Sequence, residues 1–348
     1  MTTVKARATV GPREPFKLVD IERRELQPND ITIDVQFAGI CHSDIHTARN
    51  EWGEALFPLV PGHEIAGVVS SVGNAVTAFK VGDRAGVGCF VDTCRECDNC
   101  KAGDDHNCER GITGTYNAVD KYGKPTAGGY SEQIVIDENY ALRIPEGIDM
   151  AQAAPLMCAG ITLYSPLKRW GAGPGKKVAI VGMGGLGHMG VKIANAMGAE
   201  VTVLSQSLKK QEDGMRLGAE HYYATSDEGT FENLSRSFDL IISTVSANVD
   251  FTQYLGLVRA GGALVLVGLP DKEISVAPFA LVGPEVSLAG SHIGSIKMTQ
   301  EMLDFCGEHN LGAEVEVISG SQIDEAYDRV VGSDVRYRFV IDIAKLGD

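Results

Sequence analysis

Four cysteines in one short stretch have the type and spacing to bind a metal ion. Cys94, Cys97, Cys100 and Cys108 follow the pattern C-x2-C-x2-C-x7-C. Four thiolates this close together can surround one zinc ion in a tetrahedron that leaves no coordination position open. A closed site of this kind indicates a structural zinc rather than a catalytic one. The alternative use of the same thiolates is as a redox sensor.

A second set of residues has the composition of an open zinc site. Cys41, His63 and Cys158 offer two sulfurs and one nitrogen, as in catalytic zinc sites that keep a fourth position for water or substrate. Taken separately, Cys41 could be a buried thiol, His63 a core histidine and Cys158 a cysteine of a helix. Their presence in a chain that also carries a four-cysteine cluster favours a metal site. Cys89 and Cys306 have no partner at ligand spacing, so we expect both to be buried apolar thiols.

A glycine motif after the apolar run VAIV predicts a nucleotide site. Gly182, Gly184 and Gly187 form G-x-G-x-x-G between an expected strand and an expected helix. In that context the glycines allow a tight turn, close approach of a diphosphate and close packing of helix on strand. The N-terminus of the helix then faces the negative charge of the phosphates. A plain glycine turn is the alternative.

The end of the next expected strand bears on the choice of cofactor. An NAD site usually has Asp or Glu there, which accepts a hydrogen bond from the ribose 2′-OH. This chain has no carboxylate at that point, and its residues are Ser205, Gln206, Ser207, Lys209 and Lys210. Hydroxyl and ammonium groups can bind a 2′-phosphate, so the sequence favours NADP(H). The alternative is that the lysines form an ordinary solvated helix face.

The elements that must position these residues predict an α/β protein with an inserted domain. The first 150 residues contain short β-type runs such as ITIDVQFAG, IAGVVSSVG and YSEQIVI, separated by turn residues. Apolar strands then alternate with helices, among them an expected helix YLGLVRAGG, which is typical of a doubly wound parallel sheet. After about Gly290 a helix begins a tail that we expect to return to the first lobe. The predicted domains are residues 1–150 with 290–348, and residues 151–289.

Length, charge and composition oppose several classes of protein. A chain of 348 residues suggests two domains, and a net charge of −15 opposes broad electrostatic binding to nucleic acid or to an anionic membrane. No apolar run is long enough to span a bilayer, and the N-terminal run MTTVKARATV lacks the apolar core of a signal peptide. Eight cysteines without a secretion signal favour a reducing compartment, which predicts a cytoplasmic protein.

Several motifs together resemble the zinc-dependent medium-chain alcohol dehydrogenases. They are C-H-S-D-x-H at 41–46, G-H-E-x2-G-x5-G-x2-V at 62–76, the four-cysteine lobe and GMGGLG. The later motifs SLKK, GSHIGS, EMLDFC and DVRYRFVID resemble the cinnamyl alcohol dehydrogenase branch, particularly its bacterial NADP(H)-dependent members. The resemblance covers essentially the whole chain. It implies a GroES-like β-rich catalytic domain with a zinc lobe at about 89–110, an inserted Rossmann domain, and two zinc ions per subunit.

The resemblance also implies roles at the catalytic zinc. Cys41, His63 and Cys158 are expected to bind the metal. Glu64 is expected to enter the coordination shell when substrate or water leaves, and support of the ligands from outside that shell is its alternative role. Asp44 is expected to orient His63 and fix its tautomer, with capping of a turn as the alternative.

The implied reaction is hydride transfer between nicotinamide C4 and a primary alcohol or aldehyde at the zinc. Ser43 is expected to take the alcohol proton and pass it through the cofactor ribose to His46, because imidazole groups exchange protons near neutral pH. The alternative roles are a helix N-cap for Ser43 and an ordinary surface histidine for His46.

Further residues are expected to contact the cofactor because they lie at the glycine loop, at strand ends or in the returning loop. They are His42, Thr162, Gly182, Gly184, Gly185, Leu186, Gly187, Ser205, Gln206, Ser207, Lys210, Thr244, Val245, Gly268, Ser291, Ile293 and Arg338. For Arg338, a structural salt bridge is the alternative to pairing with the diphosphate. His188 has no ligand role and is expected on a helix surface.

The expected substrate pocket is an apolar slot lined by Trp52, Phe90, Tyr116 and Ile293. Plant members of the family often carry an aromatic residue where this chain has Gly114. That departure opposes a strictly cinnamyl-type substrate and favours a broad range of aromatic and medium aliphatic aldehydes.

Other functions are opposed by particular residues. A zinc-free quinone reductase of the same superfamily would lack Cys41, His63 and Cys158. A zinc-ribbon protein that binds nucleic acid is opposed by the net charge and by the glycine motif. A non-catalytic structural homologue is opposed by the complete ligand set.

A homo-oligomer is expected by resemblance, with a dimer favoured and a tetramer as the alternative. The apolar stretch ISVAPFALV at 274–282 could pair edge to edge with a second copy across a two-fold axis.

Overall fold

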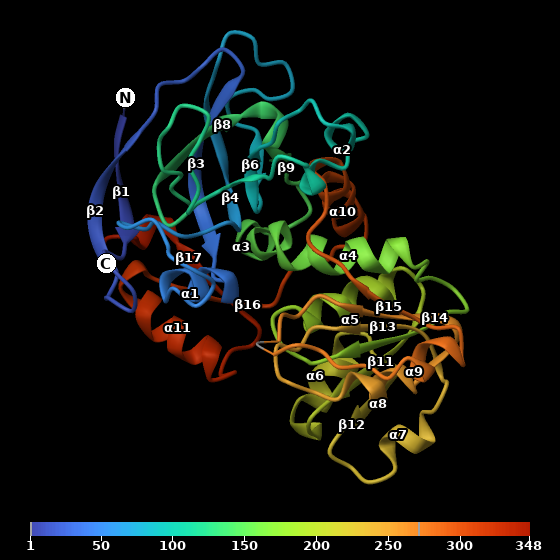
Figure 1. The fold of residues 1–348 in the computed structure, drawn as a ribbon. Helices are drawn as coiled ribbons and strands as arrows, with labels where there is room; N and C mark the ends of the chain where they lie inside the picture. The colour runs from blue at the N-terminus through green and yellow to red at the C-terminus, as the bar shows by residue number, and fades with distance from the viewer. Residues whose placement is uncertain (1, 271) are drawn as a thin grey trace. The chain divides into compact units, whose positions relative to one another are not determined.

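The computed structural model describes residues 2–270 and 272–348 and divides into two compact units (Figure 1). The first unit consists of Met1–Cys158 and Gly294–Asp348, and the second of Ala159–Ile293. The chain therefore leaves the first unit, forms the second and returns. The boundaries fall at 158/159 and 293/294, against the 150/151 and 289/290 that we predicted, because helix α3 (Met150–Ala153) packs on strands of the first unit.

The first unit is built around a seven-stranded sheet in the order β16-β17-β3-β4-β5-β9, with β8 also paired to β3. Its strands are β3 (Asp30–Gly39), β4 (Ile65–Val72), β5 (Arg84–Val87), β8 (Gln133–Asp137), β9 (Leu142–Arg143), β16 (Val315–Ile318) and β17 (Arg338–Asp342). Alternate residues of β3 enter the core, since Ile31 and Ile33 are fully buried. The tail does return to the first lobe, because β17 pairs antiparallel with β3.

Smaller elements surround this sheet. The strands are β1 (Thr2–Ala8), β2 (Lys17–Arg23), β6 (Phe90–Asp92) and β7 (Thr113–Gly114), and the other helices are α1 (His42–Ala48), α2 (Asp98–Lys101), α10 (Ile296–Glu308) and α11 (Ile323–Val331). Short 3-10 turns are η1 (Asp105–Asn107), η2 (Glu138–Tyr140), η3 (Ala154–Met157), η5 (Gly320–Gln322) and η6 (Ile343–Lys345).

The second unit contains a six-stranded parallel sheet in the order β12-β11-β10-β13-β14-β15. Its strands are β10 (Lys177–Val181), β11 (Glu200–Ser205), β12 (His221–Ala224), β13 (Phe238–Ser243), β14 (Val258–Leu266) and β15 (Ser287–Gly290). This order, 3-2-1-4-5-6 along the chain, is that of a Rossmann dinucleotide-binding fold. The predicted α/β class, a β-rich domain with an inserted doubly wound domain, is confirmed.

The helices of the second unit are short, and two predictions about its elements are wrong. Its helices are α4 (Ala159–Arg169), α5 (Gly187–Ala196), α6 (Gln211–Arg216), α7 (Thr230–Asn233), α8 (Phe251–Leu255) and α9 (Phe279–Val282), with the 3-10 turn η4 (Leu208–Lys210). The predicted helix YLGLVRAGG ends at Leu255, and its second half begins β14. Gly262 suits that strand because a Cβ there would lie 2.6 Å from the Asp239 carbonyl oxygen. His188 is not on a surface but fully buried in α5.

The stretch at 274–282 also differs from the prediction. It forms an irregular segment followed by α9, so it offers no strand for edge-to-edge pairing. Within residues 2–270 and 272–348, no helix has both the length and the apolar content needed to cross a membrane.

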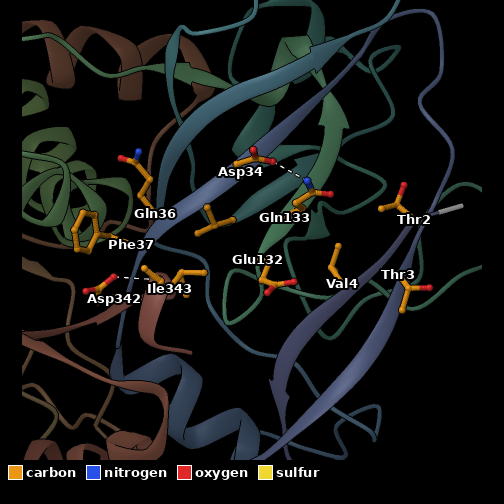
Figure 2. A pocket seen from close by; sticks show the side chains of 12 residues that line it. Thr2, Thr3, Val4, Asp34, Gln36, Phe37, Glu132, Gln133, Asp342 and Ile343 are labelled. Atoms are coloured by element: carbon orange, nitrogen blue, oxygen red, sulfur yellow. Dashed lines mark hydrogen bonds between the residues drawn. The ribbon is translucent and has the colours of Figure 1, made fainter. Parts of the chain in front are cut away.

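A surface groove of about 780 Å³ lies in the first unit, bordered by β1, the middle of β3 and the start of β8 (Figure 2). Asp34 accepts a hydrogen bond from Gln133 in its wall, at 2.7 Å. Glu132 and Asp342 add two more carboxylates, and none of the twelve described lining residues is a cysteine or a histidine. The groove therefore has a different chemistry from the predicted zinc sites.

Candidate metal and cofactor sites

Four residues from three separate segments of the chain meet in the first unit. Cys41 immediately precedes α1, His63 and Glu64 immediately precede β4, and Cys158 follows η3. One ligand atom from each of the four lies within 4.8 Å of all the others, and all four side chains are buried. The Sγ atoms of Cys41 and Cys158 are 4.0 Å apart. Two thiolates bound to one tetrahedral zinc lie about 3.8 Å apart, so this spacing suits a zinc ion.

The polar atoms of the cluster also suit a metal. His63 Nδ1 lies 3.1 Å from Asp44 Oδ1, which leaves Nε2 as the nitrogen available to a metal. Glu64 Oε2 is buried and has no hydrogen-bond partner among the residues that the structure describes. A buried carboxylate oxygen without a donor is costly, and a cation beside it would remove that cost. The donor set of two sulfurs, one imidazole and one carboxylate is therefore compatible with zinc.

Asp44 holds two of the ligand-bearing segments together. Its carboxylate is fully buried and accepts hydrogen bonds from the backbone N–H groups of Cys41, at 2.9 Å, and of Gly62, at 3.1 Å. Together with the bond to His63, these contacts connect the start of α1 with the segment before β4. Asp44 thus takes part in the capping box of α1 and contacts the imidazole that we predicted it to orient.

Glu64 forms a buried ion pair with Arg338 of β17. Burial raises the pKa of Glu64 to about 7, although the positive charge of Arg338 opposes the rise. Burial disfavours the charged form of Arg338, but the charges of Glu64 and Cys41 outweigh this effect and raise its pKa. Arg338 therefore forms the salt bridge that was the alternative to its predicted cofactor contact.

The thiols of the cluster share hydrogen bonds. A hydrogen bond with Cys158 lowers the pKa of Cys41 well below its usual value, and the same bond raises the pKa of Cys158. Cys89 is a neighbour that the sequence analysis misjudged. It is half-buried rather than an isolated core thiol, and a hydrogen bond with Cys158 lowers its pKa. Cys306 is fully buried, as predicted.

The predicted relay residues lie on consecutive turns of α1. Ser43 Oγ is 3.7 Å from the Cys41 Sγ atom, and His46 follows three residues later on the same helix face. His46 Nδ1 lies 2.7 Å from Glu51 Oε2, and its ring stacks on Trp52 at a centroid distance of 4.7 Å. Glu51 was missed by the sequence analysis because a lone surface Glu carries no motif.

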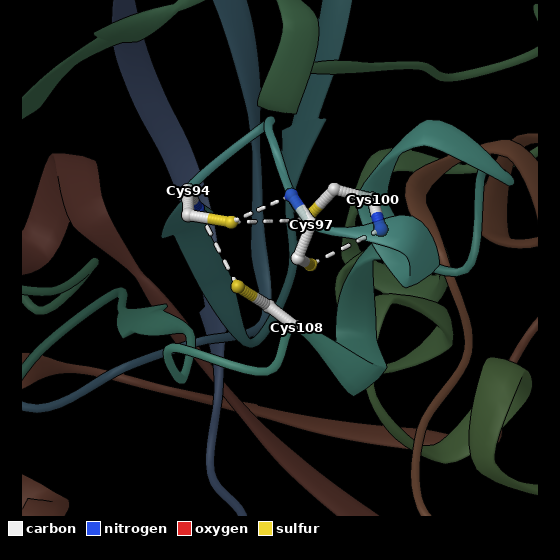
Figure 3. Close-up of side chains that lie close together, drawn as sticks. All are labelled: Cys94, Cys97, Cys100 and Cys108. Carbon is white, nitrogen blue, oxygen red and sulfur yellow. Dashed lines mark hydrogen bonds between the residues drawn. The ribbon is translucent and has the colours of Figure 1, made fainter.

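The four cysteines of the lobe also come together (Figure 3). The Sγ atoms of Cys94 and Cys100 are 3.8 Å apart, and one sulfur from each of the four lies within 4.8 Å of the rest. Backbone N–H groups point at these sulfurs: those of Glu96 and Cys97 reach Cys94, at 3.5 and 3.4 Å. Such donors favour the thiolate form that binds zinc.

The glycine loop of the second unit contains two positions that require glycine. Gly182 has a φ of +93°, and a Cβ on Gly187 would lie 2.0 Å from the Gly182 carbonyl oxygen, so a side chain is excluded there. Thr244 Oγ1 donates to the Val181 carbonyl oxygen at 2.8 Å, which joins the loop after β13 to the end of β10. Lys210 Nζ donates to the Met183 carbonyl oxygen at 3.1 Å, so its ammonium lies at the glycine loop.

The remaining predicted residues are placed as follows. Gly184, Gly185 and Leu186 complete the loop before α5, and Thr162 lies in α4. Ser205 ends β11, with Gln206 and Ser207 after it, and the residues that follow β13, β14 and β15 include Val245, Gly268 and Ser291, respectively. Ile293 ends the second unit, and His42 begins α1 in the first. Of the predicted pocket residues, Tyr116 lies beside His63 at a ring distance of 5.8 Å, and Phe90 packs on Tyr140 at 5.9 Å.

Comparison with known proteins identifies the family. The alcohol dehydrogenase GroES-like domain matches residues 27–146, and the zinc-binding dehydrogenase domain matches residues 185–308. The chain is 61% identical over 347 residues to NADP-dependent alcohol dehydrogenase C 1 of Mycolicibacterium smegmatis, a match that covers 99% of each chain.

Two solved structures share the whole fold. A cinnamyl alcohol dehydrogenase from Sorghum bicolor is 41% identical with a TM-score of 0.95, over 99% of this chain and 98% of that one. A cinnamyl alcohol dehydrogenase from Helicobacter pylori, complexed with NADP(H), is 42% identical with a TM-score of 0.92, over 99% of both. The chain belongs to the zinc-binding alcohol dehydrogenases, in the branch that contains the cinnamyl alcohol dehydrogenases.

Proposed function

We propose that this chain is an NADP(H)-dependent alcohol dehydrogenase and aldehyde reductase with a catalytic zinc at Cys41, His63 and Cys158. The observation that carries the proposal is the convergence of these three side chains and Glu64 within 4.8 Å in a buried cluster. When bound, zinc supplies a Lewis acid at the alcohol or aldehyde oxygen, and the nicotinamide donates or accepts the hydride. The protein residues must hold the reactants, exclude water and move one proton.

Ser43 and His46 are proposed to move that proton. Ser43 is next to the ligand segment, and its hydroxyl lies 3.7 Å from Cys41 Sγ, so it can reach a substrate oxygen held at the cluster. His46 lies one helical turn further on, and 25% of its side chain is exposed, which suits exchange with solvent. Glu51 engages Nδ1 of His46, so Nε2 is the nitrogen that would take the proton from the cofactor ribose.

NADP(H) is the proposed cofactor, and the residues after β11 are proposed to select it. Ser205, Ser207 and Lys210 offer two hydroxyls and one ammonium to a 2′-phosphate, with no carboxylate to repel it. The names of the M. smegmatis relative and of the H. pylori complex agree with this preference. The other cofactor contacts, including those of Thr162, Val245 and Ile293, are proposed by resemblance.

The proposed substrates are aromatic and medium aliphatic aldehydes and the corresponding primary alcohols. Tyr116 beside His63, together with the buried Phe90, supports an apolar pocket. Gly114 lacks the aromatic side chain found in many plant members, which favours broad specificity.

The four-cysteine lobe is proposed to bind a second, structural zinc. Its sulfurs have tetrahedral spacing, and four thiolates leave no open position for a substrate. This metal would stabilise the lobe and take no part in the reaction.

A homodimer is proposed, with α9 in its interface. Phe279 and Val282 lie three positions apart on α9 and are 86% and 72% exposed, which is unusual for two neighbouring large apolar residues. We also propose a cytoplasmic location, because eight cysteines without a disulfide among the described residues suit a reducing compartment.

A panel of aldehydes assayed with NADPH and with NADH tests the proposed function. Oxidation of NADPH with benzaldehyde and with a medium aliphatic aldehyde is the expected result. Equal or better use of NADH would refute the cofactor preference. Zinc in the protein without turnover on any aldehyde or alcohol would favour a non-catalytic homologue.

A further inference from the structure

Asp44 accepts one hydrogen bond that the motif around it does not account for. Besides Cys41, Gly62 and His63, its carboxylate accepts a bond from the hydroxyl of Tyr130, at 3.4 Å to Oδ2. Asp44 is fully buried, so each donor offsets part of the cost of removing its charge from water. Without the Tyr130 hydroxyl, the backbone N–H of Cys41 would be the remaining described donor to Oδ2.

Tyr130 is packed tightly against the segment that bears His63. The residue is fully buried in the loop before β8, and its backbone N–H donates to the Pro61 carbonyl oxygen at 3.0 Å. Its ring lies against Gly62, where an added Cβ would come within 2.7 Å of Tyr130 Cδ1. Gly62 also has a φ of +105°, so both its backbone conformation and this contact exclude a side chain.

A second tyrosine extends the chain of hydroxyls. Tyr327 lies on α11, in the segment that returns to the first unit, and its hydroxyl donates to Tyr130 Oη at 3.4 Å. Phe16 packs against both rings, at 6.1 Å from Tyr130 and 5.3 Å from Tyr327. Burial, assisted by the charge of Asp44, raises the pKa of both phenols well above its usual value, so both remain hydrogen-bond donors.

We propose that Tyr130 and Tyr327 are positioning residues, which hold Asp44 and through it keep the imidazole of His63 turned toward the zinc. The bonds run from Tyr327 to Tyr130, from Tyr130 to Asp44, and from Asp44 to His63 Nδ1. Neither tyrosine belongs to the cluster of Cys41, His63, Glu64 and Cys158. The proposal rests on the proposed zinc site, and it makes the C-terminal helix α11 a part of that site.

The test measures release of zinc from the full-length, zinc-loaded protein to a chromogenic chelator. Zinc should leave the two sites in two kinetic phases. The phase that disappears in the His63→Ala variant is assigned to the site of Cys41, His63 and Cys158. Removing a group that supports a ligand from outside the coordination shell typically weakens metal affinity about 10- to 100-fold. Tyr130→Phe is therefore expected to speed this phase at least about 10-fold. Tyr327→Phe, one bond further from the metal, is expected to speed it less, and the phase of the four-cysteine lobe should not change.

Tyr254→Phe is the matched control. Tyr254 is also buried and also hydrogen-bonded, to Thr225, but it lies in the second unit. This variant should release zinc at the wild-type rate. Cobalt substitution adds a spectroscopic readout, because a change in the orientation of His63 should shift the visible absorption of cobalt in the Cys41, His63 and Cys158 site. A merely destabilised fold would leave that spectrum unchanged.

The outcomes separate this inference from the proposed function. If wild-type protein lacks a zinc-release phase that depends on His63, the proposed catalytic zinc itself is wrong. If that phase exists but Tyr130→Phe and Tyr327→Phe match wild type in rate and cobalt spectrum, the positioning role is refuted. Should Tyr130→Phe fail to fold, Tyr327→Phe decides alone, with unchanged release counting against the proposal.

Discussion

Removal of Arg338 should destabilise the first unit strongly, because it would leave the carboxylate of Glu64 buried without its cation. The exposed fractions of the two residues are 4% for Arg338 and zero for Glu64. Breaking a buried ion pair by removing one partner typically costs about 3–5 kcal/mol, since the remaining charge is uncompensated. One carboxylate oxygen of Glu64 already lacks a donor among the described residues, so no neighbouring group is in place to take over.

We therefore expect Arg338→Met to lower the free energy of unfolding by about 3–5 kcal/mol, when zinc has been removed from both proteins and the pH is well above the raised pKa of Glu64, about 7. Near neutral pH the loss should be smaller, because Glu64 takes up a proton once Arg338 is gone. The double variant Glu64→Gln/Arg338→Met should regain most of this loss, because it contains no unpaired charge. Arg329→Met is the control: Arg329 pairs with Glu316 at 2.8 Å, but both side chains are one-third exposed, so solvent screens the pair and its loss should cost much less than the loss of Arg338.

Urea unfolding followed by tryptophan fluorescence measures these differences. The chain contains two tryptophans, Trp52 in the first unit and Trp170 in the second, so a Trp170→Phe background reports on the first unit alone. A loss of stability for Arg338→Met no larger than that for Arg329→Met would refute the reasoning. So would a double variant as unstable as Arg338→Met, because the loss would then not come from the unpaired charge of Glu64.

Four further changes test the proposed sites. Ser43→Ala should reduce kcat by at least about 100-fold while zinc content is unchanged, and unchanged kcat would remove Ser43 from the relay. Lys210→Ala should raise KM for NADPH about 10-fold or more with little effect on NADH, and equal effects on both cofactors would contradict a 2′-phosphate contact. Gly187→Ala should abolish cofactor binding in a fluorescence titration, because its Cβ would lie 2.0 Å from a backbone oxygen, and normal binding would contradict the loop geometry. Cys97→Ser should lose one zinc and lower the melting temperature, and any loss of activity should follow from that loss of stability. A stable, correctly assembled but inactive variant would argue against a purely structural lobe.

Much of the fold could be predicted because its strands carry clear local patterns. The run KKVAIVG with its glycine loop identified the start of the Rossmann fold, and apolar strands at EVTVLS and HYYA continued it. The helix predicted at YLGLVRAGG failed because short apolar stretches fit both helical and extended periods. In β14, pairing with β13 decided the conformation, and that partner is distant in the sequence.

The ligand types of the candidate site and the contact of Asp44 with His63 could also be predicted, whereas the two tyrosines behind Asp44 could not. Cys41 and Cys158 are 117 positions apart, but their residue type suggested a shared metal. No motif in the sequence connects Tyr130 and Tyr327 with the metal site, since a buried tyrosine most often only packs in a core. Only in the folded chain does the Tyr130 hydroxyl reach Asp44 and the Tyr327 hydroxyl reach Tyr130. His188 was misplaced for a similar reason, because the sequence did not show that its side of α5 is covered.

The most direct test of the central claim is zinc content measured together with benzaldehyde-dependent NADPH oxidation, for wild type and Cys158→Ser. We predict two zinc ions per chain and steady turnover for wild type, and one zinc ion without turnover for Cys158→Ser. One zinc per chain and no turnover in the wild-type protein would contradict the account. Full turnover by Cys158→Ser after loss of one zinc would contradict it as well.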